Sequence, residues 1–323
     1  MLLTYVDAIR QALAEEMRRD PAVFLLGEDI GIYGGAFKAT AGLVDEFGPA
    51  RVVDTPLAES AIVGAAIGAA YTGMRPVVEM QFMDFIACCF NQITNFAAKS
   101  HYRWGAPVPM VIRGPVGGGV HGGPFHSQNP EMYFAHTPGL KVVEPATARD
   151  AYGLLKSAIR DNNPVLFLEH KFLYRRVKEE IAEDGPAIPL GVAAVARPGR
   201  DLSVITYGAM VQLALETAQA LAAEGVDAEV LDLRTLAPLD RGGIVATAKK
   251  TNKVLILHED TRTGGIAGEI TAILQEEAFD DLDAPILRLT SADTPVPFSP
   301  PLEAAFLPSA EGLKAALRRL ARY

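Results

Sequence analysis

Short apolar runs alternate with amphipathic or small-residue stretches along the first half of the chain. Runs rich in Val, Ile and Leu are typical of strands buried on both faces of a parallel sheet. The stretches between them have helical spacing, so the pattern predicts an α/β fold with a mostly parallel sheet covered on both faces. The predicted strands are residues 23–26, 77–79, 108–112, 142–143 and 165–168.

A similar alternation returns in the second half. Strands are predicted at 202–206, 228–231, 254–257 and 286–289, and helices at 211–223 and 266–278. Residues 171–199 between the halves are charged and contain Pro and Gly, which is typical of a connection between domains. A chain of 323 residues can form two cores. We therefore predict two α/β domains, residues 1–185 and 201–323, joined by a linker at 186–200.

Composition and charge argue against several classes of partner and site. The net charge is −9 and no large Lys/Arg cluster occurs, which argues against nucleic-acid binding. The N-terminal stretch is amphipathic and contains acidic residues, unlike a targeting peptide, and no apolar run reaches membrane-spanning length. We expect a cytoplasmic protein without a membrane partner. The adjacent Cys88 and Cys89 lie in an apolar segment, which favours packing over a disulfide or a metal site.

The segment DTPLAES places Glu59 at the N-terminal edge of residues 60–73, which are nearly all small or apolar and predict a buried helix. No Lys or Arg nearby in the sequence neutralises this carboxylate. An acidic residue in a first turn interacts favourably with the helix dipole and can cap the helix. Glu59 therefore either caps this helix or faces a ligand that needs an anion, and the residues alone leave both open.

A glycine-rich loop begins at Gly117 and matches G-x-G-x-x-G after a predicted strand, with Glu144 in the place of a ribose-binding acid. No helical pattern follows the last glycine, so dinucleotide binding is weakly supported. Such a loop lets the backbone approach a ligand or a partner chain. It carries His121 and His126, for which no third metal ligand has convincing spacing. His126 suits proton transfer.

Several blocks of the sequence together resemble one family. They are DTPLAESAIVGAAIG, VEMQFMDF, GGGVHGG followed by HSQNPE, FAHTPGLKVVEP and SAIRDNNPVLFLEHK. In this order they resemble the β subunit of thiamin-diphosphate-dependent 2-oxo acid dehydrogenases, the E1 component, over essentially the whole chain. The resemblance implies an N-terminal pyrimidine-binding domain and a C-terminal transketolase-like domain. It also implies oxidative decarboxylation of a 2-oxo acid and acylation of a lipoyl-bearing E2 acyltransferase.

The resemblance gives roles to individual residues. Glu59 matches the glutamate that bonds N1′ of the thiamin aminopyrimidine, and Phe85 matches the aromatic residue that stacks on this ring. Further residues match positions that line the cofactor site, namely Glu28, Leu57 and Gln81. His126 matches the histidine that transfers protons at the substrate and in acyl transfer to lipoate. His121 has no such counterpart.

Two features concern bound ions. Enzymes that hold thiamin diphosphate on one chain carry Gly-Asp-Gly upstream of Asn-Asn to bind Mg²⁺ and the diphosphate, and this chain lacks that motif. The resemblance thus implies that a separate α subunit binds the Mg²⁺ ion and the diphosphate, in an α2β2 heterotetramer.

The Asn162-Asn163 segment matches a structural monovalent-cation (K⁺) loop, although the sequence Asp-Asn-Asn-Pro is also typical of a turn. The matching cation ligands are Met110, Ala158, Ile159, Asp161 and Asn163.

The segments HSQNPE and FLEHK look most like branched-chain 2-oxo acid enzymes, with pyruvate and acetoin enzymes as close alternatives. His170 departs from the proline expected before Lys171, so the substrate stays open. Two other classes make different predictions. A nicotinamide-dependent dehydrogenase would bind NAD on this chain alone. A non-catalytic scaffold would keep the activity of its complex when Glu59 and His126 are changed.

Overall fold

The computed structural model describes residues 1–323 and divides into two compact units. Unit 1 comprises Met1–Val116 and Tyr133–Leu190, and unit 2 comprises Gly117–Met132 and Gly191–Tyr323. The glycine-rich loop thus packs with unit 2, although the predicted ranges 1–185 and 201–323 follow chain order and assign it to the first domain. None of the helices combines the length and the apolar character needed to cross a membrane.

Unit 1 is built on parallel strands in the order β6-β7-β5-β4-β2-β3. Their central residues are apolar and buried, as expected for strands covered on both faces. The pair β1 and β8 forms a small antiparallel sheet. The strand bounds are β1 Leu2–Thr4, β2 Val23–Gly27, β3 Val52–Asp54, β4 Arg75–Glu79, β5 Val111–Val116, β6 Lys141–Val143, β7 Val165–His170 and β8 Lys178–Glu180.

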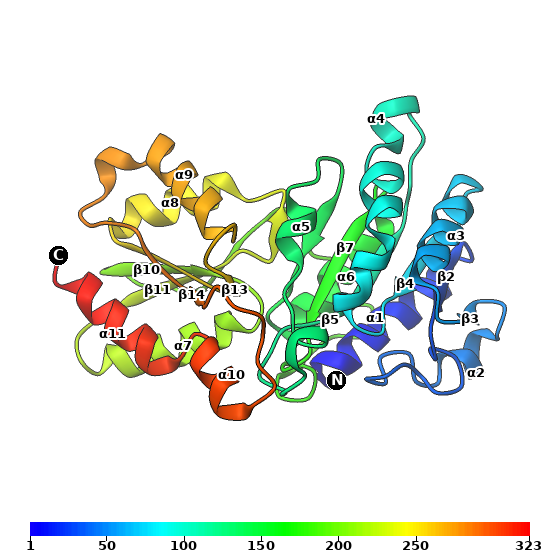
Figure 1. The fold of residues 1–323 in the computed structure, drawn as a ribbon, viewed down its shortest axis with the longest axis horizontal. Coiled ribbons are helices and arrows are strands. Elements are labelled where there is room, and N and C mark those ends of the chain that lie inside the picture. The colour runs from blue at the N-terminus through cyan, green and yellow to red at the C-terminus, as the bar shows by residue number, and fades with distance from the viewer. The chain divides into compact units, whose positions relative to one another are not determined.

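Helices α1 and α6 of unit 1 lie side by side (Figure 1). Each begins at a threonine whose side chain caps it: Thr4 accepts from Asp7 N at 3.2 Å, and Thr147 from Asp150 N at 3.0 Å. The helix bounds are α1 Tyr5–Arg19, α2 Leu43–Phe47, α3 Glu59–Tyr71, α4 Ser100–Trp104, α5 Glu131–Ala135 and α6 Ala148–Arg160, with a 3₁₀ helix η1 at Met83–Cys89 and a π-helix η2 at Gln92–Ala97.

Unit 2 contains a five-stranded sheet in the order β14-β13-β10-β11-β9, parallel except for the edge strand β9. Helices α8 and α9 cover one face and α7 and α11 the other (Figure 1). These two units confirm the predicted α/β fold. The bounds are η3 Gly123–Phe125, β9 Ala194–Arg197, β10 Leu202–Thr206, α7 Met210–Ala222, β11 Ala228–Asp232, β12 Thr235–Ala237, α8 Arg241–Thr251, β13 Val254–Thr261, α9 Ala267–Glu277, η4 Phe279–Asp281, β14 Leu287–Ser291, α10 Pro300–Phe306 and α11 Ala310–Ala321.

Two local predictions differ from the structure. The predicted strand 108–112 starts later, as β5, because Pro109 has no N–H for a ladder and Met110 N donates to Val108 O at 2.8 Å. The segment 171–199 is not wholly a connection, since it contains β8 and β9.

Helix α3 is buried on one face only, whereas the composition of residues 60–73 predicts a fully buried helix. Ile62, Val63 and Ile67 are buried, but Gly64 and Gly68 are exposed. The larger apolar side chains recur at helical spacing and select the inner face. Alanine and glycine also occupy the exposed face, and because they count as apolar residues, the composition made the whole helix look buried.

Candidate active site

Three adjacent parallel strands of unit 1 bring all five residues predicted to bind a cofactor to one edge of the sheet. Glu28 directly follows β2, Leu57 and Glu59 follow β3, and Gln81 and Phe85 follow β4. The strands are parallel, so these residues come from the same, carboxyl edge, where open α/β sheets bind ligands. Leu57 is 77% exposed and leaves an apolar surface there.

Glu28 and Glu59, called the edge pair below, are carboxylates without a basic partner. Glu28 is only 8% exposed and its Oε1 has no hydrogen-bond partner. Burial raises the pKa of Glu28, and the nearby Glu59 carboxylate raises this pKa further. Glu59 is half-buried and forms no ion pair. Two such groups suit a ligand that donates hydrogen bonds or carries a proton.

The structure shows how Glu59 lies at the start of its helix. The N-cap of α3 is Ala58, and no side chain makes a capping hydrogen bond there. Glu59 is the first residue of the helix, so its charge lies near the positive end of the helix dipole. The carboxylate therefore makes no capping hydrogen bond, although its first-turn position is favourable for the helix dipole, and its contact with a ligand stays a prediction.

Phe85 presents a half-buried ring at this edge, at the start of η1. It contacts Phe82 edge-on, with ring centroids 6.4 Å apart, and Phe82 contacts Phe37 at 5.6 Å. Edge-on aromatic contacts of this kind fix ring orientation. Ser60 Oγ donates to Cys88 O at 2.6 Å and so ties the start of α3 to η1. The ring of Phe85 and the carboxylate of Glu59 thus lie on elements that are joined directly.

His126 lies in unit 2, on the loop Gly117–Met132, which we call the histidine loop. It is half-buried and directly follows η3. A Cβ at Gly122 would lie 2.8 Å from Ser127 Oγ, so glycine is required where the loop folds back beside His126. No α-helix begins at the last glycine of the motif, as dinucleotide binding would require. His121 is exposed.

Two residues that sequence reasoning missed hold this loop. Glu259 and Glu303 accept hydrogen bonds from its backbone N–H groups. Glu259 follows the apolar run 254–257, and a polar residue at the end of a buried strand is a usable signal. Glu303 gives no such signal, since it lies 182 positions from His121, to which it is bonded.

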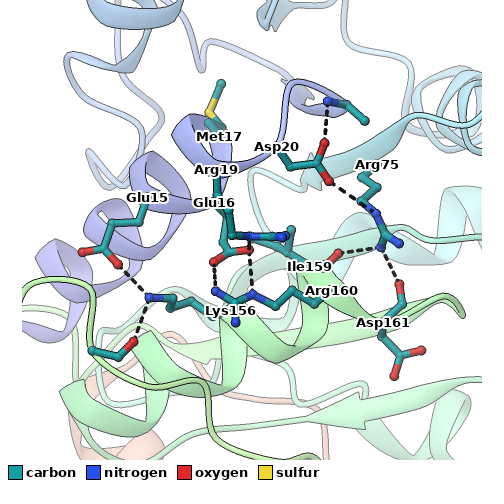
Figure 2. A network of polar contacts seen from close by, with 12 residues as sticks. Glu15, Glu16, Met17, Arg19, Asp20, Arg75, Lys156, Ile159, Arg160 and Asp161 are labelled. Atoms are coloured by element: carbon teal, nitrogen blue, oxygen red, sulfur yellow. Dashed lines mark hydrogen bonds and ion pairs between the residues drawn. The ribbon is translucent and has the colours of Figure 1, made fainter.

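The residues predicted to bind a cation lie at the opposite, amino edge of the unit 1 sheet, around the starts of β5 and β7. Arg75 donates to the carbonyl oxygens of Ile159 and Asp161, both at 3.0 Å (Figure 2). The Met110 carbonyl accepts from Val165 N at 3.0 Å. Carbonyl oxygens can hold a hard cation, but here a guanidinium already bonds to the carbonyls of Ile159 and Asp161. The K⁺ site stays a prediction.

The remaining predicted cation ligands form part of the same turn. Asp161 N donates to the Ala158 carbonyl at 3.3 Å, and the Asp161 carboxylate accepts from Asn163 N at 2.8 Å. Lys141 Nζ donates to that carboxylate at 3.0 Å. The turn between α6 and β7 is therefore held by its own side chains and by two basic residues.

Comparison with known proteins defines the class first. Residues 2–177 match the family model described as transketolase, pyrimidine binding domain, and residues 191–313 match transketolase, C-terminal domain. A solved structure described as a split gene transketolase, inactive beta4 tetramer, has a TM-score of 0.82 and covers 99% of this chain and 98% of its own, at 24% identity. The fold is thus that of transketolase-type chains.

Curated relatives then define the family. The chain is 52% identical to 2-oxoisovalerate dehydrogenase subunit beta of Bacillus subtilis, covering 100% of this chain and 99% of the relative. It is 44% identical to the pyruvate dehydrogenase E1 component subunit beta of the same organism, covering 99% of both. It is 47% identical to acetoin:2,6-dichlorophenolindophenol oxidoreductase subunit beta of Cupriavidus necator, covering 97% and 95%. The chain belongs to the family of 2-oxo acid dehydrogenase E1 β subunits and is a component of an oxidoreductase.

Proposed function

We propose that this chain acts with an α subunit, in an α2β2 heterotetramer, as a thiamin-diphosphate-dependent 2-oxo acid dehydrogenase. The assembled enzyme decarboxylates a branched-chain 2-oxo acid and transfers the acyl group to a lipoyl-bearing E2 acyltransferase. The observation that carries this proposal is the edge pair: two carboxyl groups without a basic partner at the carboxyl edge of a domain of the pyrimidine-binding family. A cytoplasmic location is part of the same proposal.

The residues at this edge fit the aminopyrimidine end of thiamin. A flat heteroaromatic ring with an amino group and a basic nitrogen needs acceptors, a donor and an aromatic surface. Glu28, Glu59 and Gln81 offer the polar groups, and Phe85 and Leu57 offer apolar surface. We assign the Mg²⁺ ion and the diphosphate to the α subunit, because this chain lacks the Gly-Asp-Gly motif. When bound, thiamin diphosphate supplies the electron sink that decarboxylation of a 2-oxo acid requires.

The chain's own residues then bind, orient and move protons. With the cofactor bound, Glu59 would hold and exchange a proton at a nitrogen of the aminopyrimidine, the task of a positioned acid or base. Burial and the nearby Glu59 raise the pKa of Glu28, which favours the protonated form that can donate a hydrogen bond. Phe85 orients the ring by stacking, and His126 moves protons at the substrate and during acyl transfer.

Branched-chain specificity is supported by sequence identity. The 2-oxoisovalerate relative is 52% identical over the full chain, against 44% and 47% for the pyruvate and acetoin relatives named above. Pyruvate is the second candidate substrate, because a pyruvate dehydrogenase β subunit of Porphyra purpurea reaches 49% identity over 93% of this chain and 91% of its own length.

The test is to assemble the chain with its matching α subunit and to compare kcat/KM for 3-methyl-2-oxobutanoate and pyruvate. We expect a preference of at least about tenfold for the branched substrate, since each methylene buried in an apolar pocket contributes about 1–3 kcal/mol. A preference for pyruvate would instead make pyruvate the substrate of the enzyme. Binding of NAD to this chain alone, without turnover of either 2-oxo acid, would overturn both.

A further inference from the structure

The histidine loop is held by a carboxylate at each of two places. Glu259, on β13, is 6% exposed. Its Oε1 accepts from Gly118 N at 2.6 Å and from Asn129 Nδ2 at 3.1 Å. One oxygen atom therefore joins the beginning and the end of the loop, and His126 lies on the segment between them.

Glu303, on α10, is 1% exposed and binds the entrance of the same loop. Its carboxylate accepts from Gly119 N at 3.0 Å and from His121 N at 3.2 Å. It also lies 2.6 Å from His121 Nδ1 and forms no ion pair with Lys or Arg. Hydrogen bonds to a charged acceptor are stronger than neutral ones, and a buried carboxylate without its donors is costly.

Close packing limits the loop to the conformation that these bonds define. A Cβ at Gly118 would come within 3.3 Å of Glu303 Oε1, and a Cβ at Gly123 within 2.4 Å of the Phe298 ring. The loop backbone therefore lies directly against the carboxylate and against an aromatic ring. Bonds and packing together leave little freedom for another loop geometry.

We infer that Glu259 and Glu303 are positioning residues that hold the histidine loop in one conformation and so fix the backbone that carries His126. The catalytic consequence rests on the proposed function, because it requires His126 to transfer protons. Neither carboxylate is assigned a contact with substrate or cofactor. Their effect reaches the reaction through the position of the imidazole, and a small misplacement of a catalytic group costs a large factor in rate.

The experiment compares Glu303→Gln and Glu259→Gln with the control Glu311→Gln, an exposed glutamate of unit 2, in the assembled enzyme. Amide hydrogen exchange in Gly117–Met132 should accelerate at least about tenfold in the first two variants, since hydrogen bonds to a charged acceptor are stronger than neutral ones. His126 should also react faster with diethyl pyrocarbonate. The control should change neither readout.

Further variants separate positioning from general destabilisation. Glu303→Asp keeps the charge but shortens the reach, and it should restore part of the protection lost in Glu303→Gln. His121→Ala removes an exposed side chain and one of the contacts to Glu303 and places alanine at a φ of 61°, so it should raise exchange in the loop about threefold. A purely structural role for Glu303 would lower the thermal midpoint without changing the reactivity of His126.

The outcomes distinguish this inference from the proposed function. Unchanged exchange in the loop in Glu303→Gln, Glu259→Gln and His121→Ala overturns the inference, whatever their activity. Accelerated exchange together with normal turnover in His126→Ala supports the positioning of the loop and removes His126 from the proposed mechanism. Accelerated exchange with kcat reduced in parallel, and KM for the 2-oxo acid unchanged, supports both.

Discussion

Two groups of acidic residues in unit 1 each contain a buried carboxylate but differ in what neutralises it. In the first, called the helix-pair network, Lys156 Nζ donates to Glu15 at 2.8 Å, and Arg160 and Arg19 donate to Glu16 at 2.6 and 2.8 Å (Figure 2). Burial raises the pKa of Glu15, but hydrogen bonds from Lys156 and neighbouring donors outweigh this and lower the pKa below its usual value. These bonds join α1 to α6.

The second group is the edge pair, Glu28 and Glu59, which has no base. Burial and the neighbouring Glu59 carboxylate raise the pKa of Glu28 above its usual value. A buried carboxylate is costly unless a partner is present. The helix-pair network contains its partners, so its role is completed within the fold. The edge pair contains no base, and a backbone hydrogen bond from Ala58 to Glu28 only partly offsets the burial, which is the arrangement expected where a ligand supplies further donors. The two groups thus differ in charge compensation, and the proposed function assigns only the uncompensated pair to a ligand.

The largest expected effect concerns the helix-pair network. Lys156→Met leaves Glu15 buried without its cation, and breaking a buried pair from one side costs about 3–5 kcal/mol of unfolding free energy. Urea unfolding of the assembled enzyme measures this cost, and Lys314→Met, at the ion pair with the exposed Glu311, serves as the control. We expect kcat per folded enzyme to stay normal. A stability loss below about 1 kcal/mol would show that this buried ion pair contributes no more than an exposed surface pair.

The edge pair predicts the reverse outcome. Glu59→Gln should lower kcat at saturating cofactor at least about a hundredfold, the usual scale for an acid or base group and equivalent to about 2.7 kcal/mol. Its unfolding free energy should change little, because Glu59 forms no ion pair that could be lost. Steady-state kinetics of the assembled enzyme, with Glu311→Gln as control, provide the measurement. Turnover near that of the wild type would remove Glu59 from the proposed role.

Part of this comparison could be predicted from the sequence. Apolar runs marked β2, β4 and β7, and Glu59 was noticeable because no base lies near it in the sequence. The roles of Leu57 and Gln81 came only from family resemblance, since single residues in loops carry no periodic signal.

Contacts between distant segments could not be predicted. Lys156 and Glu15 are 141 positions apart, as are Gly118 and Glu259, so neither the helix-pair network nor the attachment of the histidine loop to unit 2 leaves a local pattern. Such pairs depend on which elements pack together. The proximity of Glu28 to Glu59 likewise depends on β2 pairing with β3.

The contributions of Glu28 and Glu15 to the free energy of unfolding should change with pH in opposite directions. The folded-state pKa of Glu28 is raised, so its contribution to stability is full below the unfolded pKa of about 4.3 and is lost as pH rises through the folded pKa. The folded-state pKa of Glu15 is lowered, so its contribution is present above about pH 4.3 and is lost as pH falls through the folded pKa.

The test compares the neutral variants Glu28→Gln and Glu15→Gln with the wild type by urea unfolding between about pH 4 and about pH 7. As pH rises over this range, Glu28→Gln should gain stability relative to the wild type. Glu15→Gln should lose stability relative to the wild type over the same range. If the stability of both variants relative to the wild type changed with pH in the same direction, the two carboxylates would not differ in charge compensation.

The smallest expected effect tests whether partners within the helix-pair network substitute for one another. Glu16 is buried but accepts from both Arg160 and Arg19, whose side chains are 41% and 44% exposed. Arg160→Gln removes one base and leaves the other, and pairs with a half-exposed arginine contribute about 0–1 kcal/mol, so the unfolding free energy should fall by less than about 1 kcal/mol. Combining it with Arg19→Gln removes both bases, and the double variant should lose clearly more than the sum of the single losses, because only then is the Glu16 carboxylate left buried without a cation. Strict additivity would show that solvent, rather than the second arginine, compensates the charge, and Glu16 would then resemble the edge pair more than Glu15.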